Sequence, residues 1–351
     1  MALNLLRDAK VYMSTVATGW STANTWEVKV LDGFSFSQST STQEVTLNEA
    51  GAAPNRGQKI FNTALDPVDF SFGTYVRPYM DTLDHACAES VLWDALTNGG
   101  VNTGGVATSK LTIDFSNSNA HELPKYYLYI LINDSLFVIS EAIINSAEVD
   151  FSIDGIGMIN WTGQGSTYDV TSTPVAGTHS PNPATEVTLV PTTASFLKNK
   201  LSTITMTGGP AAGTYTLGLT SASITIDNGV TFLTPEELGV VNKPIGHFTG
   251  TRAISGSFSC YLDTAANHSM ALLSDMLTDV NGSTPTVTNS FNIVLSMGGA
   301  SGIRVAFNMP KAHIVIPQIE SEDVISTSIE FTALGTGLTT TDEMTIDYYA
   351  E

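Results

Sequence analysis

The sequence has few of the residues on which redox chemistry, metal binding and phosphate binding depend. It contains two cysteines, Cys87 and Cys260, in 351 residues. Their wide separation gives neither a disulfide framework nor metal-ligand spacing, so we expect two small, buried, apolar side chains. The sequence also lacks a Gly-x-Gly-x-x-Gly motif after a strand, a phosphate-binding loop and a Cys-x-x-Cys pair.

Basic residues are scarce as well. The chain has 14 Lys and Arg against 34 Asp and Glu, a formal net charge of -20, and only 14% of its residues are charged. A protein that grips DNA needs a basic stripe whose contacts release counterions from the phosphates, and Lys and Arg do not cluster here. An acidic chain can still handle DNA by repelling it, so that the DNA slides.

Long apolar runs are missing too. The longest apolar stretch, Tyr126–Ile144, is interrupted by Asn133 and Asp134, which predicts a β-hairpin and not a membrane helix. The opening residues reach Arg7 and Asp8 at once, which is not the pattern of a signal peptide. We therefore expect a chain that is made in a cytosol and has no membrane partner.

The residues that are abundant predict an all-β protein. Hydrophobic residues make up 42% of the chain, Ser and Thr about 80 residues, and Gly 29; Thr favours strands, and Ser and Gly favour turns. Period-two alternation predicts a series of strands: 25–31 with a hairpin partner at 34–36, 68–76, 111–115, 126–132 with 135–139, and 147–154. Apolar spacing predicts two helices, at 81–97 and 264–278, the first ended by Asn98-Gly99-Gly100.

One cluster has catalytic potential. Asp81, His85 and Glu89 are four residues apart and would share one face of the first predicted helix. They could bind a metal or hold a poised histidine, but the solvated face of an acidic protein is the better interpretation. The other histidines have no neighbours at ligand spacing. We therefore predict no enzyme, no cofactor and no metal.

The second half of the sequence resembles the first. Val68–Val76 aligns without a gap with Ile254–Leu262, the two predicted helices follow, and the strand at 111–115 then matches 291–295. The end of the first half, 162–165, matches 334–337, and the long polar stretch 37–59 returns as 229–247. A common order of this kind indicates an internal duplication. It predicts a first β domain at 1–165, a Thr/Pro-rich linker at 166–192 and a second β domain at 193–351.

Acidic residues alternate with apolar ones near the end of each half. Glu148, Asp150 and Asp154 alternate with the apolar residues at 147, 149, 151 and 153. The second half has Glu320, Glu322 and Glu330 near the corresponding place. Period-two geometry puts one set of side chains in the core and the other on an exposed sheet face. That face is either an ordinary wet surface or a wall that faces a polyanion without binding it.

Three segments carry a family resemblance. The opening 1–15, the run Phe248–Leu262 and the segment Ala147–Asp154 resemble phage tail tube proteins. The resemblance implies β-sandwich or barrel domains, each flanked by one helix, with a long loop that reaches the next ring, and six domains in each ring. A duplicated chain would then form rings from three copies, with pseudo-six-fold symmetry.

The resemblance also implies a function, a location and partners. The chain would be the major tail tube subunit of a long-tailed, non-contractile, siphovirus-like phage, made in the bacterial cytoplasm and located in the virion tail. Its partners would be itself, the tape measure, tail terminator and distal tail proteins, and phage DNA in transit without specific binding. The alternatives are a distal tail or baseplate hub protein, or an adhesin made of tandem β-sandwiches.

The resemblance assigns ring stacking to the long loops and a lumen lining to the acidic strands. The residues predicted to line the lumen are Glu148, Asp150, Asp154, Glu320, Glu322 and Glu330. The residues predicted to stack rings lie in 40–59 and 230–243, and are Glu44, Asn48, Glu49, Asn55, Arg56, Lys59, Glu236, Glu237 and Lys243.

Overall fold

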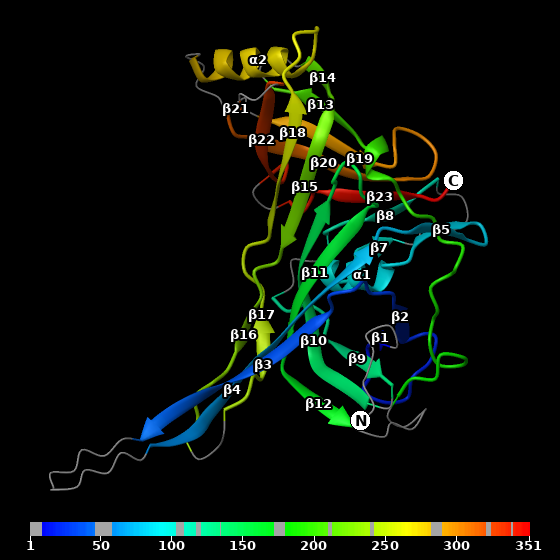
Figure 1. The fold of residues 1–351 in the computed structure, drawn as a ribbon, viewed down its shortest axis with the longest axis vertical. Helices are drawn as coiled ribbons and strands as arrows, with labels where there is room; N and C mark the ends of the chain where they lie inside the picture. Colours follow the sequence, from blue (N-terminus) through cyan, green and yellow to red (C-terminus); the bar gives the residue numbers. More distant parts are fainter. Residues whose placement is uncertain are drawn as a thin grey trace, which may run out of the picture.

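A computed structural model describes residues 9–45, 58–102, 109–116, 121–133, 135–171, 180–209, 213–238, 242–281, 290–320, 324–337 and 340–351. The fold is all-β, as predicted, with large antiparallel sheets and two α-helices in the described ranges (Figure 1). In chain order the elements are β1 (Ala9–Ser14), β2 (Thr25–Val28), β3 (Ser35–Val45), β4 (Lys59–Tyr75), β5 (Pro78–Asp81), β6 (Asp84–Cys87), α1 (Ser90–Thr97), β7 (Val101–Asn102), β8 (Leu111–Ile113), β9 (Tyr126–Ile132), β10 (Ser135–Asp150), β11 (Met158–Gly165), β12 (Thr167–Thr171), η2 (Asn199–Leu201), β13 (Thr203–Gly208), β14 (Gly213–Leu217), β15 (Leu219–Asp227), β16 (Thr231–Leu233), β17 (Gly246–Phe248), β18 (Ala253–Tyr261), α2 (Ser269–Asn281), β19 (Phe291–Met297), β20 (Arg304–Ile314), β21 (Gln318–Glu320), β22 (Ser326–Ala333) and β23 (Thr345–Tyr349).

One continuous antiparallel sheet runs through both halves of the chain, and we call it the long sheet. Its strand order is β3-β4-β11-β10-β15-β18-β22-β21. The first four strands come from the first half and the last four from the second. The pairing of β10 with β15, at 146–150 and 223–227, is the seam between them.

Each half also has a short sheet that packs against the long one. The first short sheet is β2-β1-β9-β10-β12, and the second is β14-β13-β19-β20-β23. The long strand β10 belongs to both sheets of its half, and β20, which also pairs with β22, does the same in the second half. Buried aliphatic and aromatic side chains from both halves form one core cluster between these sheets.

The two halves therefore have the same order of pairings. In the first, β2-β1-β9-β10-β11-β4-β3 follow one another, and in the second, β14-β13-β19-β20-β22-β18-β15 do so. At one matching position in the two halves, a phenylalanine and a glycine lie opposite each other but on exchanged strands. Phe70 lies opposite Gly163 in the first half, whereas Gly256 lies opposite Phe331 in the second. A Cβ on either glycine would meet its partner's ring at 2.3 or 2.6 Å, so each large ring requires a glycine across from it.

These pairings correct the sequence alignment of the halves. The counterpart of β19 is β9 and not the strand at 111–115. Both β9 and β19 pair with the first strand and with the long strand of their own half. Trp161 lies opposite Phe72 and Ile329 opposite Phe258, which moves the match for 162–165 from 334–337 to 330–333. The duplication itself and the boundary at 165 stay predictions.

The predicted helix at 81–97 is wrong in its first half. Residues 78–87 form the hairpin β5–β6, which turns at Thr82 with a φ of 59°, and α1 occupies only 90–97. The end of α1 is as predicted, because Asn98 adopts the left-handed conformation and Gly99 bonds to the carbonyl of Asp94. The second helix, α2, spans 269–281 instead of 264–278.

Other predictions about local pairing have mixed outcomes. The hairpin at 126–139 is confirmed by the pairing of β9 with β10. The expected hairpin between 25–31 and 34–36 is wrong, because β2 pairs with β1 and β3 pairs with β4. The described part of the predicted linker lies on the first half, where Thr188 bridges to Trp26 and its backbone N–H donates to the carbonyl of Thr25 at 2.9 Å.

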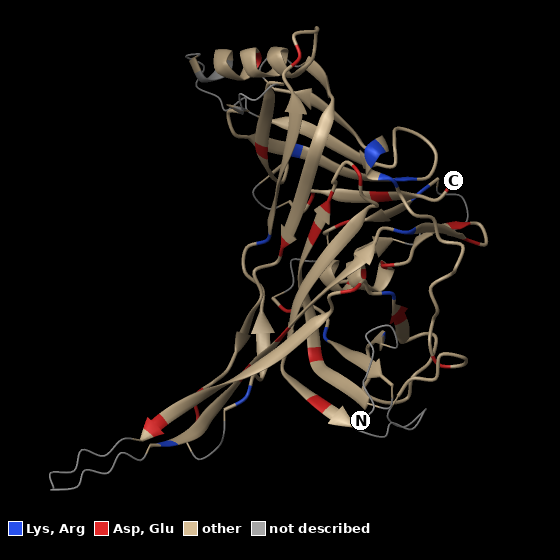
Figure 2. Ribbon diagram, in the orientation of Figure 1, with Lys and Arg blue, Asp and Glu red and all other residues tan. Residues whose placement is uncertain are grey.

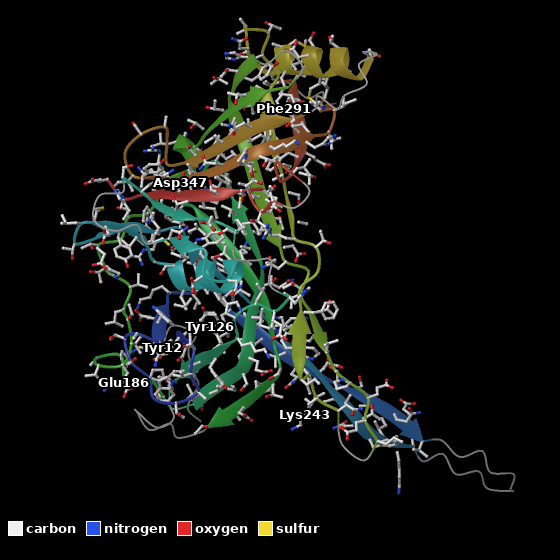
Figure 3. The ribbon with its side chains drawn as sticks, turned by 180° about the vertical axis from the view of Figure 1, so that it is seen from behind. Tyr12, Tyr126, Glu186, Lys243, Phe291 and Asp347 are labelled. Atoms are coloured by element: carbon white, nitrogen blue, oxygen red, sulfur yellow. The ribbon has the colours of Figure 1, made fainter. Side chains whose placement is uncertain are left out.

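The C-terminal strand joins the two halves a second time. β23 pairs with β20 of its own half and, on its other edge, with β8 of the first half. Asp347 in β23 is buried and accepts from Lys110 at 2.8 Å, Thr112 at 2.7 Å and Asn308 at 2.8 Å, at the junction seen in Figure 3. A buried carboxylate with three donors fixes the position of this strand.

A buried polar chain lies beside that junction. The Tyr348 hydroxyl donates to Glu89 Oε1 at 2.5 Å and accepts from Trp93 Nε1 at 2.8 Å. The backbone N–H of Arg77 donates to the Glu89 carboxylate at 3.3 Å. Burial raises the pKa of Glu89 to about 7, against the lowering effect of these hydrogen bonds.

Candidate functional site

The long sheet has one buried face and one exposed polar face. In an antiparallel pair, opposite residues point to the same side, so the registers define rows across the sheet. One row is Ser35, Ser71, Thr162, Ser146 and Asp227. Another is Tyr75, Met158, Asp150, Ser223, Ser257 and Glu330. We call the side that carries these rows the polar face.

Hydroxyl groups and carboxylates dominate the polar face. Hydroxyls pair across strands, as Ser35 with Ser71 at 2.8 Å, Ser146 with Thr162 at 2.6 Å, and Ser223 with Ser257 at 3.3 Å. The strand segments 69–75, 146–150, 158–165, 221–227, 253–261 and 326–332 contain no Lys or Arg. In Figure 2, β10 and β15 accordingly carry red segments and no blue ones. This face can repel a polyanion and offers it no cation to bind.

Three of the predicted acidic residues lie on the polar face. Glu148 and Glu330 are exposed, Asp150 is half-buried, and Asp150 and Glu330 share a row. Between the acids of β10, Ala147 and Val149 are fully buried, so the predicted alternation is confirmed up to Phe151.

The other three predicted acids have different outcomes. Asp154 is exposed in the turn between β10 and β11, beside an exposed Ile153, so its assignment to a strand face is wrong. Glu320 lies in β21, opposite Ser326. Glu322 lies outside the described residues.

Sequence reasoning missed two further acids on this face. Asp69 follows Val68 and precedes Phe70, both buried, and accepts from Gln164 Nε2 at 2.8 Å. Asp227 follows buried Ile226 and accepts from the backbone N–H of Gly229 at 2.8 Å. Both show the same alternation as Glu148, so the signal was present in the sequence.

Two arms project from the long sheet. The first is the hairpin β3–β4, which extends well beyond the body of the molecule (Figure 1). The second is the excursion 228–249 between β15 and β18, which contains β16 and β17. The arms touch, because Leu65 donates to the carbonyl of Asn242 at 2.8 Å. The structure thus brings together the two segments that the sequence assigned to ring stacking.

The predicted stacking residues can be located in part. Glu44 and Lys59 are exposed on the first arm, where Val45 pairs with Lys59. Glu236, Glu237 and Lys243 are exposed on the second arm, and Lys243 is labelled in Figure 3. The remaining predicted residues, Asn48, Glu49, Asn55 and Arg56, lie outside the described residues.

The arms also expose large apolar side chains, which the sequence reasoning did not select. On the first arm Ile60 and Phe61 are 58% and 52% exposed, and on the second Leu238 is fully exposed and Ile245 67% exposed. Val45, Leu233 and Phe248 add to them. Several large exposed apolar side chains on projecting segments are typical of a protein–protein contact.

The cluster with catalytic potential is not a solvated helix face. His85 and Glu89 are buried, in β6 and at the start of α1, and His85 Nδ1 accepts from the backbone N–H of Ala350 at 2.9 Å. Both side chains therefore act at the junction of the halves. Among the described residues no group of three or more His, Cys, Asp or Glu is placed to hold a metal. Cys87 and Cys260 are buried free thiols, as predicted.

The ends of the long sheet are open. β3 pairs only with β4, and β21 only with β22, within the described parts of the chain. An unpaired strand edge is a template for another strand, and here the two open edges belong to opposite ends of one sheet.

Comparisons with known proteins agree on one family. The family model described as phage tail tube protein matches residues 11–333. The chain is 33% identical over 362 residues to "Tail tube protein pb6" of Escherichia phage T5, an alignment that covers 98% of this chain and 75% of that protein. No helix in the described ranges is long and apolar enough to cross a membrane.

Proposed function

The chain belongs to the phage tail tube protein family, and we propose that three copies close into a ring in which six similar halves surround a DNA-conducting lumen. It is a structural component of the virion tail that assembles with itself and contacts other tail proteins. The observation that carries the ring proposal is the seam between β10 and β15. The counterparts of these two strands, β21 and β3, lie at the two ends of the long sheet with unpaired edges.

The seam within the chain predicts the seam between chains. By position in the pairing order, β21 corresponds to the end of β10, and β3 corresponds to β15. Within the chain, Asp150 lies opposite Ser223. Transferred to the open edges, that register places Glu320 of one chain opposite Ser35 of the next. Such a head-to-tail contact closes into a ring when its rotation divides a full turn.

The register also predicts the geometry of the closed sheet. Ser223 of β15 is the counterpart of Ser35 of β3, because each lies opposite the matching serine of the next strand. The row of opposite residues that starts at Ser35 crosses four strands and reaches β15 at Asp227, four residues beyond Ser223. The stagger is thus one residue for each of the four strands. With a rise of ~3.3 Å and a strand spacing of ~4.8 Å, the strands tilt by ~35°, a usual value for barrels.

The size of the lumen follows from the same numbers. Six halves contribute 24 strands, and 24 spacings of ~4.8 Å at that tilt give a backbone diameter of roughly 45 Å. Side chains on the polar face reduce this width but leave room for a DNA duplex surrounded by water. The six-fold count is part of the proposal, whereas the tilt depends only on the register.

We assign the polar face to the lumen. Each chain would contribute Asp69, Glu148, Asp150, Asp227 and Glu330, and Glu320 corresponds to Asp150 by register. DNA phosphates would then meet a wall of their own sign, with repulsion screened over roughly 8–10 Å in physiological salt. A lumen without cations releases no counterions on contact, so the DNA is not retained.

The two arms stack one ring on the next. They project together, carry exposed apolar residues, and have no partner for these within the described chain. Contact along the tube axis stays open and repeats, so rings polymerise. The tape measure, tail terminator and distal tail proteins remain the proposed neighbours, with assembly in the host cytoplasm.

The identical order of strand pairings in the two halves supports a duplicated domain.

Disulfide cross-linking at the predicted seam tests the ring. When assembled protein is oxidised, the variant with Ser35→Cys and Glu320→Cys should give a covalent trimer in which every chain is linked to both of its neighbours. The matched control is Ser223→Cys with Asp150→Cys, which occupies the same register inside one chain. This pair should form a disulfide within the chain and should not join one chain to another. Oxidised rings in which only the control pair cross-links would contradict the proposal.

A further inference from the structure

The strand β12 offers a third open edge, away from the long sheet. β12 spans Thr167–Thr171 and pairs on one side with β10, at the margin of the first short sheet. Its other side has no strand partner in the described residues. Val170 in this strand is 59% exposed and Tyr168 38% exposed. A short edge strand with exposed apolar side chains invites pairing with another chain.

The second half contains the covered counterpart of this edge. β23 pairs with the first part of β20, as β12 pairs with the first part of β10. The registers match Val170, opposite Phe137, with Ile346, opposite Phe307. Ile346 is fully buried because β8 of the first half covers the edge, with Ile113 directly opposite.

The same comparison applies to Tyr168. Its counterpart two residues before Ile346 is Met344, which is fully buried. Tyr168 already packs edge-on against Phe36 of β3, with ring centroids 5.8 Å apart. The open edge of β12 and the open edge of β3 therefore lie on the same side of the first half. One neighbouring molecule can cover both.

We infer that β12 is the outer seam of the contact between chains, covered by the second half of a second copy of this protein. This inference rests on the proposed ring. Inside one chain, the first half covers the second half at two places, through β10 on β15 and through β8 on β23. Between chains, the neighbour covers β3 at the inner seam and β12 at the outer seam. Val170 and Tyr168 become buried on assembly.

Thiol accessibility tests this seam residue by residue. Val170→Cys should react readily with a maleimide in the free chain, since the native cysteines are buried. In assembled tubes it should react at least about tenfold more slowly, because the reagent then needs local opening of the interface. The control is Ala184→Cys, in an exposed turn outside both proposed seams, which should remain reactive in tubes.

The outcomes separate this inference from the proposed function. Tubes in which Val170→Cys is protected and Ala184→Cys is reactive support it. Tubes in which both thiols react at the rate seen in the free chain overturn the outer seam and leave the ring intact. If the unmodified chain forms only monomers, the proposed ring fails, and the outer seam fails with it. As a second variant, Val170→Asp should fold normally but assemble poorly, and normal assembly would contradict the inference.

Discussion

Glu89 should make the stability of the folded chain depend on pH. Its pKa is raised from 4.5 to about 7 by burial between α1 and the C-terminal strand. Between these two values the folded state holds a proton that the unfolded state has lost. The contribution of Glu89 to the free energy of unfolding therefore falls as pH rises from about 4.5 through 7 and is constant above that range. A difference of two to three units corresponds to about 3 kcal/mol.

The partner of Glu89 stays protonated throughout this window. Burial and the nearby Glu89 charge raise the pKa of Tyr348 well above its usual value, so its hydroxyl remains a donor to Glu89. Glu89→Gln keeps an acceptor for that hydroxyl and removes the titration. The variant should lose most of the fall in stability between pH 5 and pH 8.

Urea unfolding at several pH values provides the measurement. The difference in slope between wild type and Glu89→Gln isolates this carboxyl from every other titrating group. The exposed Glu148→Gln is the matched control and should retain the wild-type pH dependence. If Glu89→Gln and wild type lose stability in parallel from pH 5 to pH 8, the buried-carboxyl reasoning is refuted.

Three further predictions concern the junction, an arm and the lumen. Asp347→Ala leaves three donors without their acceptor and should lower the free energy of unfolding by about 2–3 kcal/mol, measured in urea. Phe61→Ser, at a half-exposed position, should change stability by less than about 0.5 kcal/mol but shorten tubes in negative-stain images; tubes of normal length would contradict the stacking role. Glu148→Lys with Asp150→Lys should leave tubes intact but make them retain DNA at low salt and release it at high salt; tubes that never retain DNA would contradict the lumen assignment.

Local alternation carried the sequence analysis furthest. Ala147, Val149 and Phe151 point into the core because successive strand residues point to opposite faces, and this rule locates Glu148 and Asp150 correctly. The rule stops where the strand stops. Asp154 continues the pattern in sequence but lies in a turn, and the Asp154-Gly155 pair is the local signal that marks this end of the strand.

The error at α1 has a similar cause. Leu83, Cys87 and Val91 have helical spacing, yet Leu83 is 65% exposed and Cys87 is in a strand. Thr82 makes the hairpin turn with a positive φ, which β-branched residues rarely adopt. The buried role of His85 depends on Ala350, at the far end of the chain, so spacing along the sequence could not predict it.

Pairing between distant strands was also beyond the sequence. The duplication was inferred from similar segments, but a matching order of segments does not determine which strands are neighbours. The seam between β10 and β15 joins residues about 75 positions apart through backbone hydrogen bonds, which carry no side-chain signature. The open edges of β3, β12 and β21 are visible only once that pairing is known.

The number of chains in an isolated ring tests the central claim most directly. Native mass measurement of a single ring should give three copies of the chain, because each copy supplies two halves and eight strands of the long sheet. A ring of six copies would contradict the account, since the lumen would then need twice the predicted number of strands.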